Sequence, residues 1–255
     1  MTGPPQSRDA DPEDGLTAGH GRGGDGVPGI RRVAPLGSSA VDTTLPGTPA
    51  DLLGPERDGT ERMVPSRLAE FAAARRCGHL ALEGLGVRPV GIPRGVRGRP
   101  FWPDGVIGSL THCGGYAAAV VADARDLAGL GIDAEPHAPL PPKVLEHVSG
   151  PPEIDDLATL SAVSPGIAWD RIQFCAKEAA FKTLSASDQR CSRLVDLQVR
   201  IELTGTVTVV PRLSGPGRSP GAGRGDRRHG WWAVELGRIV VCVALEHDQR
   251  ALTNL

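Results

Sequence analysis

The spacing of apolar side chains predicts two main helices. Across residues 66–85, apolar positions recur every three or four residues, and glycines at 84 and 86 then end the pattern. Across residues 168–184 the same period returns, with polar side chains between two apolar flanks. A shorter helical piece is expected between the prolines at 139–142 and those at 151–152.

Short apolar-rich runs bounded by glycine or proline predict the strands. The expected strands are residues 106–110, 116–122, 130–135, 197–203, 207–213, 231–236 and 239–245. A tight turn at Cys113-Gly114-Gly115 separates the first two. Helices and strands mix without regular β-α-β alternation, so the predicted fold class is α+β. Each half of the chain, about residues 31–136 and 137–250, reads as a helix with antiparallel strands, which suggests internal pseudo-twofold symmetry.

Composition divides the chain further. The 34 glycines and 23 prolines are about twice the usual share and predict long unstructured stretches. Residues 1–30 hold almost no large apolar side chain, so we expect a disordered tail there. Glycine, proline and arginine likewise predict a flexible loop at residues 214–230, and residues 31–62 are transitional.

Charge and cysteine content exclude several classes of protein. The net charge of −2 argues against a nucleic-acid coat, which carries a strong basic excess. No apolar run approaches the ~18 residues that span a membrane. The N-terminal segment lacks the apolar core of a signal peptide, so we expect a cytoplasmic protein. The five cysteines are widely spaced and form no Cys-x-x-Cys pair, so neither a disulfide framework nor a zinc site is predicted.

Asp133 and Glu135 are the first candidates for chemistry. On a strand, residues i and i+2 point to the same face, so these two carboxylates project together. Adjacent carboxylates repel each other unless a proton or a cation lies between them, and Mg²⁺ prefers oxygen ligands of this kind. The alternative is a pair of acids at a solvated strand end.

The helix at residues 168–184 is the second candidate. At 3.6 residues per turn, its polar stripe consists of Arg171, Cys175, Glu178 and Lys182. A polar stripe between apolar flanks is typical of a helix that is packed on both sides, with its charged edge facing a cleft. The alternative is an ordinary surface pair, because Glu178 and Lys182 have the favoured i,i+4 orientation.

An arginine-rich segment is the third candidate. Residues 63–105 carry seven arginines against three acids, whereas residues 1–62 carry six arginines against ten acids. The basic side chains are Arg75 and His79 on one helix face, and Arg94, Arg97 and Arg99 in the Gly/Pro loop that follows. Arginine clusters recognise phosphate through paired hydrogen bonds. The alternative is a solvated basic surface.

Thr111 and His112 are the fourth candidate. They stand at a predicted strand end just before a glycine turn, where a hydroxyl and an imidazole could line a phosphate pocket. His112 and Cys113 are adjacent, so their side chains oppose each other on a strand and a Cys–His pair has poor geometry. A purely structural histidine is the alternative.

Taken in order, five segments resemble the 4′-phosphopantetheinyl transferases, in particular the surfactin-type branch represented by enterobactin synthetase component D. The segments are Glu70–Cys77, Arg99–Gly105, Val106–Cys113, Gly129–Pro136 and Trp169–Lys182, the last with a Lys177-Glu178-Ala179 core. Their order and spacing are family-like over residues 50–184. Five linked motifs are more specific than any one of them, and together they favour the functional interpretation of each.

The resemblance implies a reaction and its partners. Such enzymes move phosphopantetheine from coenzyme A to a serine of an acyl or peptidyl carrier protein and release adenosine 3′,5′-bisphosphate. The carriers are domains of polyketide, nonribosomal peptide or fatty acid synthases, in secondary metabolite pathways that include siderophore synthesis. The resemblance also implies an α+β fold of two similar halves with the site between them, and a monomer.

The resemblance further implies roles for the candidate residues. Asp133, Glu135 and Glu178 match the family's Mg²⁺ ligands. Glu178 is also the candidate base for the serine hydroxyl, and Lys177 the candidate for stabilising or protonating the leaving phosphate. The residues expected to bind coenzyme A are Arg75, His79, Arg94, Arg97, Thr111, His112, Glu178 and Lys182.

The chain departs from the family pattern in two places. His79 stands where relatives often carry a second arginine, which would weaken phosphate binding at neutral pH. Residues 185–192 lack the aromatic side chains that relatives carry there. Two other functions stay open: a coenzyme A-binding protein without transferase activity, and a Mg²⁺-dependent phosphohydrolase that uses the same acids.

Overall fold

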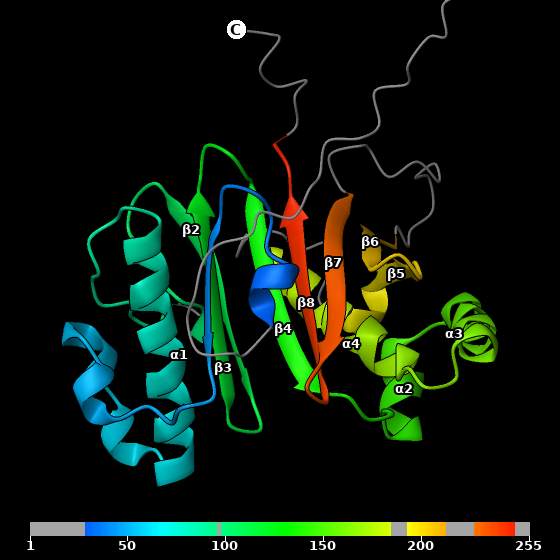
Figure 1. The fold of residues 1–255 in the computed structure, drawn as a ribbon, viewed down its shortest axis with the longest axis horizontal. Helices are drawn as coiled ribbons and strands as arrows, with labels where there is room; N and C mark the ends of the chain where they lie inside the picture. The colour runs from blue at the N-terminus through cyan, green and yellow to red at the C-terminus, as the bar shows by residue number, and fades with distance from the viewer. Residues whose placement is uncertain (1–28, 96–97, 185–192, 213–226, 248–255) are drawn as a thin grey trace, which may run out of the picture.

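The computed structural model describes residues 29–95, 98–184, 193–212 and 227–247. Two antiparallel sheets stand side by side, and one long helix packs on each of them (Figure 1). The fold class is therefore α+β, as the sequence predicts. None of the described helices is long and apolar enough to cross a membrane. The predicted tail lies outside the described residues except for its last two positions, and Ile30 is buried.

The smaller sheet has the strand order β1-β3-β2. Its strands are β1 (Ser39–Thr43), β2 (Val106–Cys113) and β3 (Tyr116–Asp123). The turn between β2 and β3 is the predicted one, and both of its glycines have positive φ angles, which suits a two-residue hairpin.

The helix α1 (Pro65–Gly84) covers this sheet with a row of small side chains. Proline at its first position has the φ angle that a helix needs. At the other end Gly86 adopts a left-handed conformation, and the Val87 amide donates to the Leu82 carbonyl at 2.9 Å, which closes the helix. The predicted helix at 66–85 is thus confirmed.

The larger sheet has the strand order β4-β8-β7-β6-β5. Its strands are β4 (Gly129–Pro136), β5 (Leu197–Ile201), β6 (Thr206–Pro211), β7 (Arg228–Glu235) and β8 (Arg238–Leu245). The helix α4 (Trp169–Thr183) packs its apolar side chains on one face of this sheet and confirms the helix predicted at 168–184. Two shorter helices, α2 (Pro142–Val148) and α3 (Pro151–Val163), precede it.

The two sheets meet where β2 runs beside β4 (Figure 1). Among the described residues the two strands form no ladder, and side-chain hydroxyls of β2 join them instead. Ser109 Oγ accepts a hydrogen bond from the Ile132 amide at 3.1 Å, and Thr111 Oγ1 donates to Asp133 Oδ1 at 3.2 Å. Apolar side chains from β3, β4 and β8 fill the space behind these contacts.

Three local predictions differ from the structure. β1 lies in the stretch that was expected to be transitional, and its five residues are all half-buried, without the alternation that marks a strand. α3 was not predicted, because Pro151 and Pro152 read as a break although proline suits the first turn of a helix. Of the predicted loop 214–230, residues 214–226 lie outside the described part, and residues 228–230 belong to β7.

The predicted division into halves near residue 136 stays a prediction. β4 pairs with β8 along its whole length and so belongs to the larger sheet, although it precedes residue 137.

Candidate active site

The acids of β4 lie on one face of the strand, as the spacing predicts. Leu130, Ile132 and Ala134 point into the core between the two sheets. Asp133 and Glu135 alternate with them and face the other way. Asp133 is buried and Glu135 is partly exposed.

Gly131 brings the strand into contact with α4. A Cβ atom at this position would lie 1.9 Å from the carbonyl oxygen of Ala179. Only glycine therefore allows the two backbones to approach this closely. Because Ala179 follows Glu178 directly, this contact holds the helix acid beside the strand acids.

The polar stripe of α4 faces the two strand acids. Arg171 Nη1 donates to Glu135 Oε2 at 3.1 Å near the start of the helix. Lys182 Nζ donates to Asp133 Oδ1 at 2.8 Å near its end. Between these two contacts Cys175 is fully buried, and its thiol pKa is raised by burial and by the nearby Asp133 carboxylate. The stripe thus points toward β4.

Glu178 belongs to the same electrostatic cluster. Burial and the charge of Asp133 raise the pKa of Glu178, and the same two causes raise the pKa of Glu135. Asp133 Oδ2 is buried and has no hydrogen-bond partner. Among the described residues, no three His, Cys, Asp or Glu side chains already stand close enough to ligate a metal. The three acids are therefore coupled by charge, with one carboxylate oxygen left unsatisfied.

A basic cluster lies on α1 and the loop that follows it, where Arg94 is exposed. Arg75 is buried, and its guanidinium stacks on the Phe71 ring at 4.4 Å from the centroid. Arg94 stacks on the same ring at 4.2 Å. Burial lowers the pKa of Arg75 to about 10; the charge of Glu56 opposes this shift, and the positive charge of Arg94 adds to it. Its Nε atom is buried without a hydrogen-bond partner and lies 3.8 Å from Glu56 Oε1, so a buried carboxylate already offsets part of its charge.

The basic cluster extends toward the acids through His112. Its ring contacts the Arg67 guanidinium, and its Nδ1 atom lies 3.4 Å from Glu70 Oε2. Burial and the charge of Arg67 lower the pKa of His112, and the charges of Lys182 and Asp133 also act on it. Thr111 precedes it and bonds Asp133. Arg67 was not predicted as a site residue, although it is one of the seven arginines in residues 63–105.

Three further residues were predicted for the site from the sequence. Lys177 is fully buried and pairs with Glu153 of α3, so the assignment of a catalytic role to it is not supported by its surroundings. His79 faces Glu56 in the short 3₁₀ helix η3 (Gly54–Arg57), with Nε2 at 2.8 Å from Oε1. The same oxygen lies 3.8 Å from Arg75 Nε, so His79 lies beside the basic cluster and is engaged by a carboxylate. Arg97 lies outside the described residues.

Comparison with known proteins decides the family. Residues 56–122 match the model of the 4′-phosphopantetheinyl transferase N-terminal domain, and residues 129–226 match that of the 4′-phosphopantetheinyl transferase superfamily. The 4′-phosphopantetheinyl transferase Svp of Streptomyces mobaraensis is 44% identical over 210 residues, which are 80% of this chain and 82% of that protein. The chain belongs to the 4′-phosphopantetheinyl transferase superfamily.

Two further relatives agree with this. The 4′-phosphopantetheinyl transferase PptT of Mycobacterium tuberculosis is 39% identical to this transferase, over 72% of this chain and 82% of that protein. Enterobactin synthase component D of Salmonella typhi is 39% identical over 82 residues, 32% of each chain. The resemblance seen in the sequence motifs is confirmed, and the protein is an enzyme that transfers the phosphopantetheinyl group with coenzyme A as substrate.

Proposed function

We propose that this transferase converts an apo carrier protein to its holo form at the seam between the two sheets. The serine oxygen of an acyl or peptidyl carrier attacks the β-phosphorus of coenzyme A, and the bond from that phosphorus to the bridging oxygen breaks. The phosphopantetheine is then esterified to the serine, and adenosine 3′,5′-bisphosphate leaves. The observation that carries this proposal is the seam itself, where a basic cluster with Arg75 at its buried end adjoins three acids that are coupled by charge.

The basic cluster is proposed to hold the phosphates of coenzyme A. Arg75 and Arg94 present two guanidinium groups around Phe71. Guanidinium groups bind phosphate oxygens in pairs, and burial strengthens such contacts. Thr111, His112 and Lys182 continue this surface toward the acids and are proposed to bind phosphate as well. Arg97 is retained as a proposal from the sequence pattern alone.

Asp133, Glu135 and Glu178 are proposed to hold Mg²⁺. The unsatisfied buried oxygen of Asp133 fits a hard cation. After burial, the charge of Asp133 raises the pKa values of Glu135 and Glu178, and a bound cation would relieve this repulsion between the acids. When bound, the ion would offset the negative charge of the diphosphate. Binding of the ion and of phosphate would require Lys182 to share or release Asp133 Oδ1, which it contacts now.

Glu178 is proposed to accept the serine proton. A carboxylate whose pKa is raised by burial and by a neighbouring acid is a stronger base than an ordinary glutamate. Its backbone is fixed by the contact of α4 with Gly131, so the carboxylate has a defined place beside Asp133.

The carriers, the compartment and the oligomeric state are proposals as well. The enzyme is proposed to be a cytoplasmic monomer that serves carrier domains of polyketide, nonribosomal peptide or fatty acid synthases. A siderophore pathway is one such setting, since four relatives are named enterobactin synthase component D.

The intact mass of carrier domains tests this function. Apo carriers are incubated with coenzyme A, Mg²⁺ and the enzyme, with a Glu178→Gln variant alongside. The wild type should add one phosphopantetheine per carrier, and the variant should bind coenzyme A but transfer far more slowly. Binding of coenzyme A without any mass increase would indicate an inactive binding protein. Release of adenosine bisphosphate without a carrier would indicate a phosphohydrolase.

A further inference from the structure

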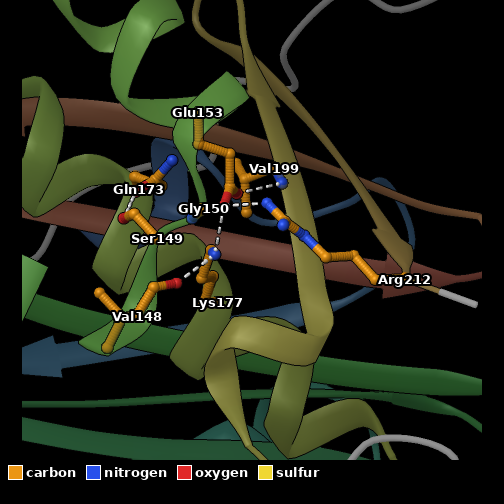
Figure 2. A network of polar contacts seen from close by, with 8 residues as sticks. All are labelled: Val148, Ser149, Gly150, Glu153, Gln173, Lys177, Val199 and Arg212. Carbon is orange, nitrogen blue, oxygen red and sulfur yellow. Dashed lines mark hydrogen bonds and ion pairs between the residues drawn. The ribbon is translucent and has the colours of Figure 1, made fainter. Parts of the chain in front are cut away.

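Lys177 lies next to Glu178 in the sequence but in a separate polar network (Figure 2). Its ammonium donates to Glu153 Oε2 at 2.9 Å and also to the Val148 carbonyl. Lys177 is 0% exposed and Glu153 is 1% exposed. A buried charge is costly unless it is paired and hydrogen-bonded, so each of these side chains depends on the other.

The Glu153 carboxylate joins four parts of the fold. Besides Lys177 on α4, its Oε2 atom accepts from Arg212 Nη2 at 2.6 Å, just after β6. The same oxygen accepts from the Gly150 amide at 3.1 Å, at the start of α3. Its Oε1 atom accepts from the Val199 amide of β5 at 2.9 Å. A carboxylate held by four donors has little freedom, so it is a fixed point to which Lys177 is anchored.

A second bond ties the same face of α4 to the same segment. Gln173 precedes Lys177 by four residues and therefore lies on the same side of the helix. Its side-chain oxygen accepts from Ser149 Oγ, between Val148 and Gly150 (Figure 2). Gln173 is 1% exposed. Two buried bonds one turn apart set the rotation of α4 about its axis, whereas apolar packing alone would tolerate small rotations.

The rotation of α4 decides where Glu178 points. Consecutive residues on a helix are separated by about 100°, so fixing Lys177 toward α3 directs Glu178 toward β4. The charges around the two residues agree with this. Those that act on Lys177 come from Glu153 and Arg212, whereas those that act on Glu178 come from Asp133, Glu135 and Lys182. The two side chains therefore serve different surroundings.

We propose that Glu153 and Lys177 are a positioning pair that orients Glu178 toward the strand acids, and that Lys177 does not contact the substrate. This inference rests on the proposed role of Glu178 in metal binding. It assigns to Lys177 a role through the helix rather than through phosphate, and it makes Glu153 a residue on which transfer depends although it lies outside the acid cluster.

Three variants test the pair: Lys177→Met, Glu153→Gln and the double variant. Lys177→Met keeps the length of the side chain, and Glu153 keeps Arg212 as its counter-ion, so this variant leaves no unpaired buried charge. Ile172→Val, a small core change on the same helix, is the control for general loosening. The measurements are Mn²⁺ affinity by electron paramagnetic resonance, coenzyme A affinity without metal by calorimetry, and single-turnover transfer. Thermal unfolding is followed for every variant.

If the two residues position Glu178, the variants should show a specific pattern of losses. Residues that orient metal ligands typically affect affinity or activity by about 10–100-fold. Lys177→Met should therefore weaken Mn²⁺ binding and slow transfer by roughly tenfold or more, with coenzyme A affinity unchanged. Because the two residues act as a unit, the double variant should lose no more than the worse single variant. Ile172→Val should change neither metal affinity nor rate.

Other results overturn the proposal. A loss of coenzyme A affinity in Lys177→Met, or losses that multiply in the double variant, would place Lys177 on the substrate. Unchanged Mn²⁺ affinity in Lys177→Met, with Glu178→Gln strongly impaired, would refute the pair alone. Unchanged Mn²⁺ affinity in Glu178→Gln as well would refute the proposed metal site. If Glu153→Gln does not fold, Lys177→Met by itself still separates these outcomes.

Discussion

Lys182 and Asp133 form an ion pair of 2.8 Å that crosses from α4 to β4. The same ammonium donates to the Ile132 carbonyl at 2.8 Å, so it anchors the helix on the strand and offsets the charge of the acid. About a third of the Lys182 side chain is exposed, whereas the Asp133 side chain is only one-tenth exposed. The ammonium of Lys182 can therefore turn toward a phosphate while its side chain stays between α4 and β4, and its role in phosphate binding can be tested by substitution.

Lys182→Met should weaken coenzyme A binding. Hydrogen bonds to charged groups contribute about 1.5–3 kcal/mol, and about 1.4 kcal/mol is tenfold in affinity, so a loss of roughly tenfold is expected. Calorimetric titration with coenzyme A measures it. Lys143→Met, an exposed lysine on α2, is the matched control. Equal affinity in the two variants would remove Lys182 from the phosphate site.

Asp133→Asn should abolish most of the transfer rate while the fold persists. The change keeps the size of the side chain and its bond from Thr111, but removes the charge that a cation needs. We expect a loss of at least ~100-fold at saturating coenzyme A, since a metal ion supplies several kcal/mol of charge stabilisation. Single-turnover transfer across a Mg²⁺ series measures this. Asp123→Asn, at the end of β3, is the control and should keep the wild-type rate.

Arg94→Met should discriminate between coenzyme A and its shorter fragment. If Arg94 binds the nucleotide phosphates, affinity for coenzyme A should fall roughly tenfold, and affinity for 4′-phosphopantetheine should not change. Competition binding with both compounds measures the difference. Arg200→Met, at a side chain that is 82% exposed, controls for net charge. An equal loss for both ligands would mean that Arg94 acts elsewhere.

Glu56→Gln should change the acid stability of the protein. Burial alone would raise the pKa of Glu56, but hydrogen bonds from His79 and from two backbone amides outweigh it, and the pKa is lowered below 4.5. A lowered folded-state pKa contributes stability above the unfolded pKa, and this contribution is lost as the pH falls through the folded value. The variant should lose about 1–3 kcal/mol at pH 7.

Urea unfolding from pH 7 to pH 3.5 checks this prediction. The difference in unfolding free energy between wild type and Glu56→Gln should shrink below about pH 4.5. Glu202→Gln, on an exposed side chain, should show no such trend. A difference that stays constant with pH would mean that Glu56 is protonated throughout.

The sequence predicted the helices and strands that carry strong patterns. α1 and α4 follow a clear helical period, and the two glycines between β2 and β3 favour a tight turn without help from the rest of the fold. β1 and α3 could not be found in this way. The five residues of β1 show no alternation of apolar and polar side chains, and α3 begins with two prolines that equally well mark a break.

The candidate site was predictable where residues share one element. The common face of Asp133 and Glu135, and the stripe with Arg171 and Lys182, follow from strand and helix geometry alone. The partners of His79 and Lys177 could not be predicted in this way. Both pair with glutamates on distant segments, and only the tertiary fold brings those segments together.

Gly131 sets the width of the acid pocket. Since the bare backbone of β4 touches the carbonyl of Ala179, the distance between strand and helix is already at its lower limit and no side chain can adjust it. A single methyl group at this position would push α4 outward and move Glu178 away from both strand acids. The neighbours Leu130 and Ile132 point into the core instead, where similar aliphatic residues can replace them. A library randomised over these three codons and selected for transfer should keep one codon invariant and let its two neighbours drift.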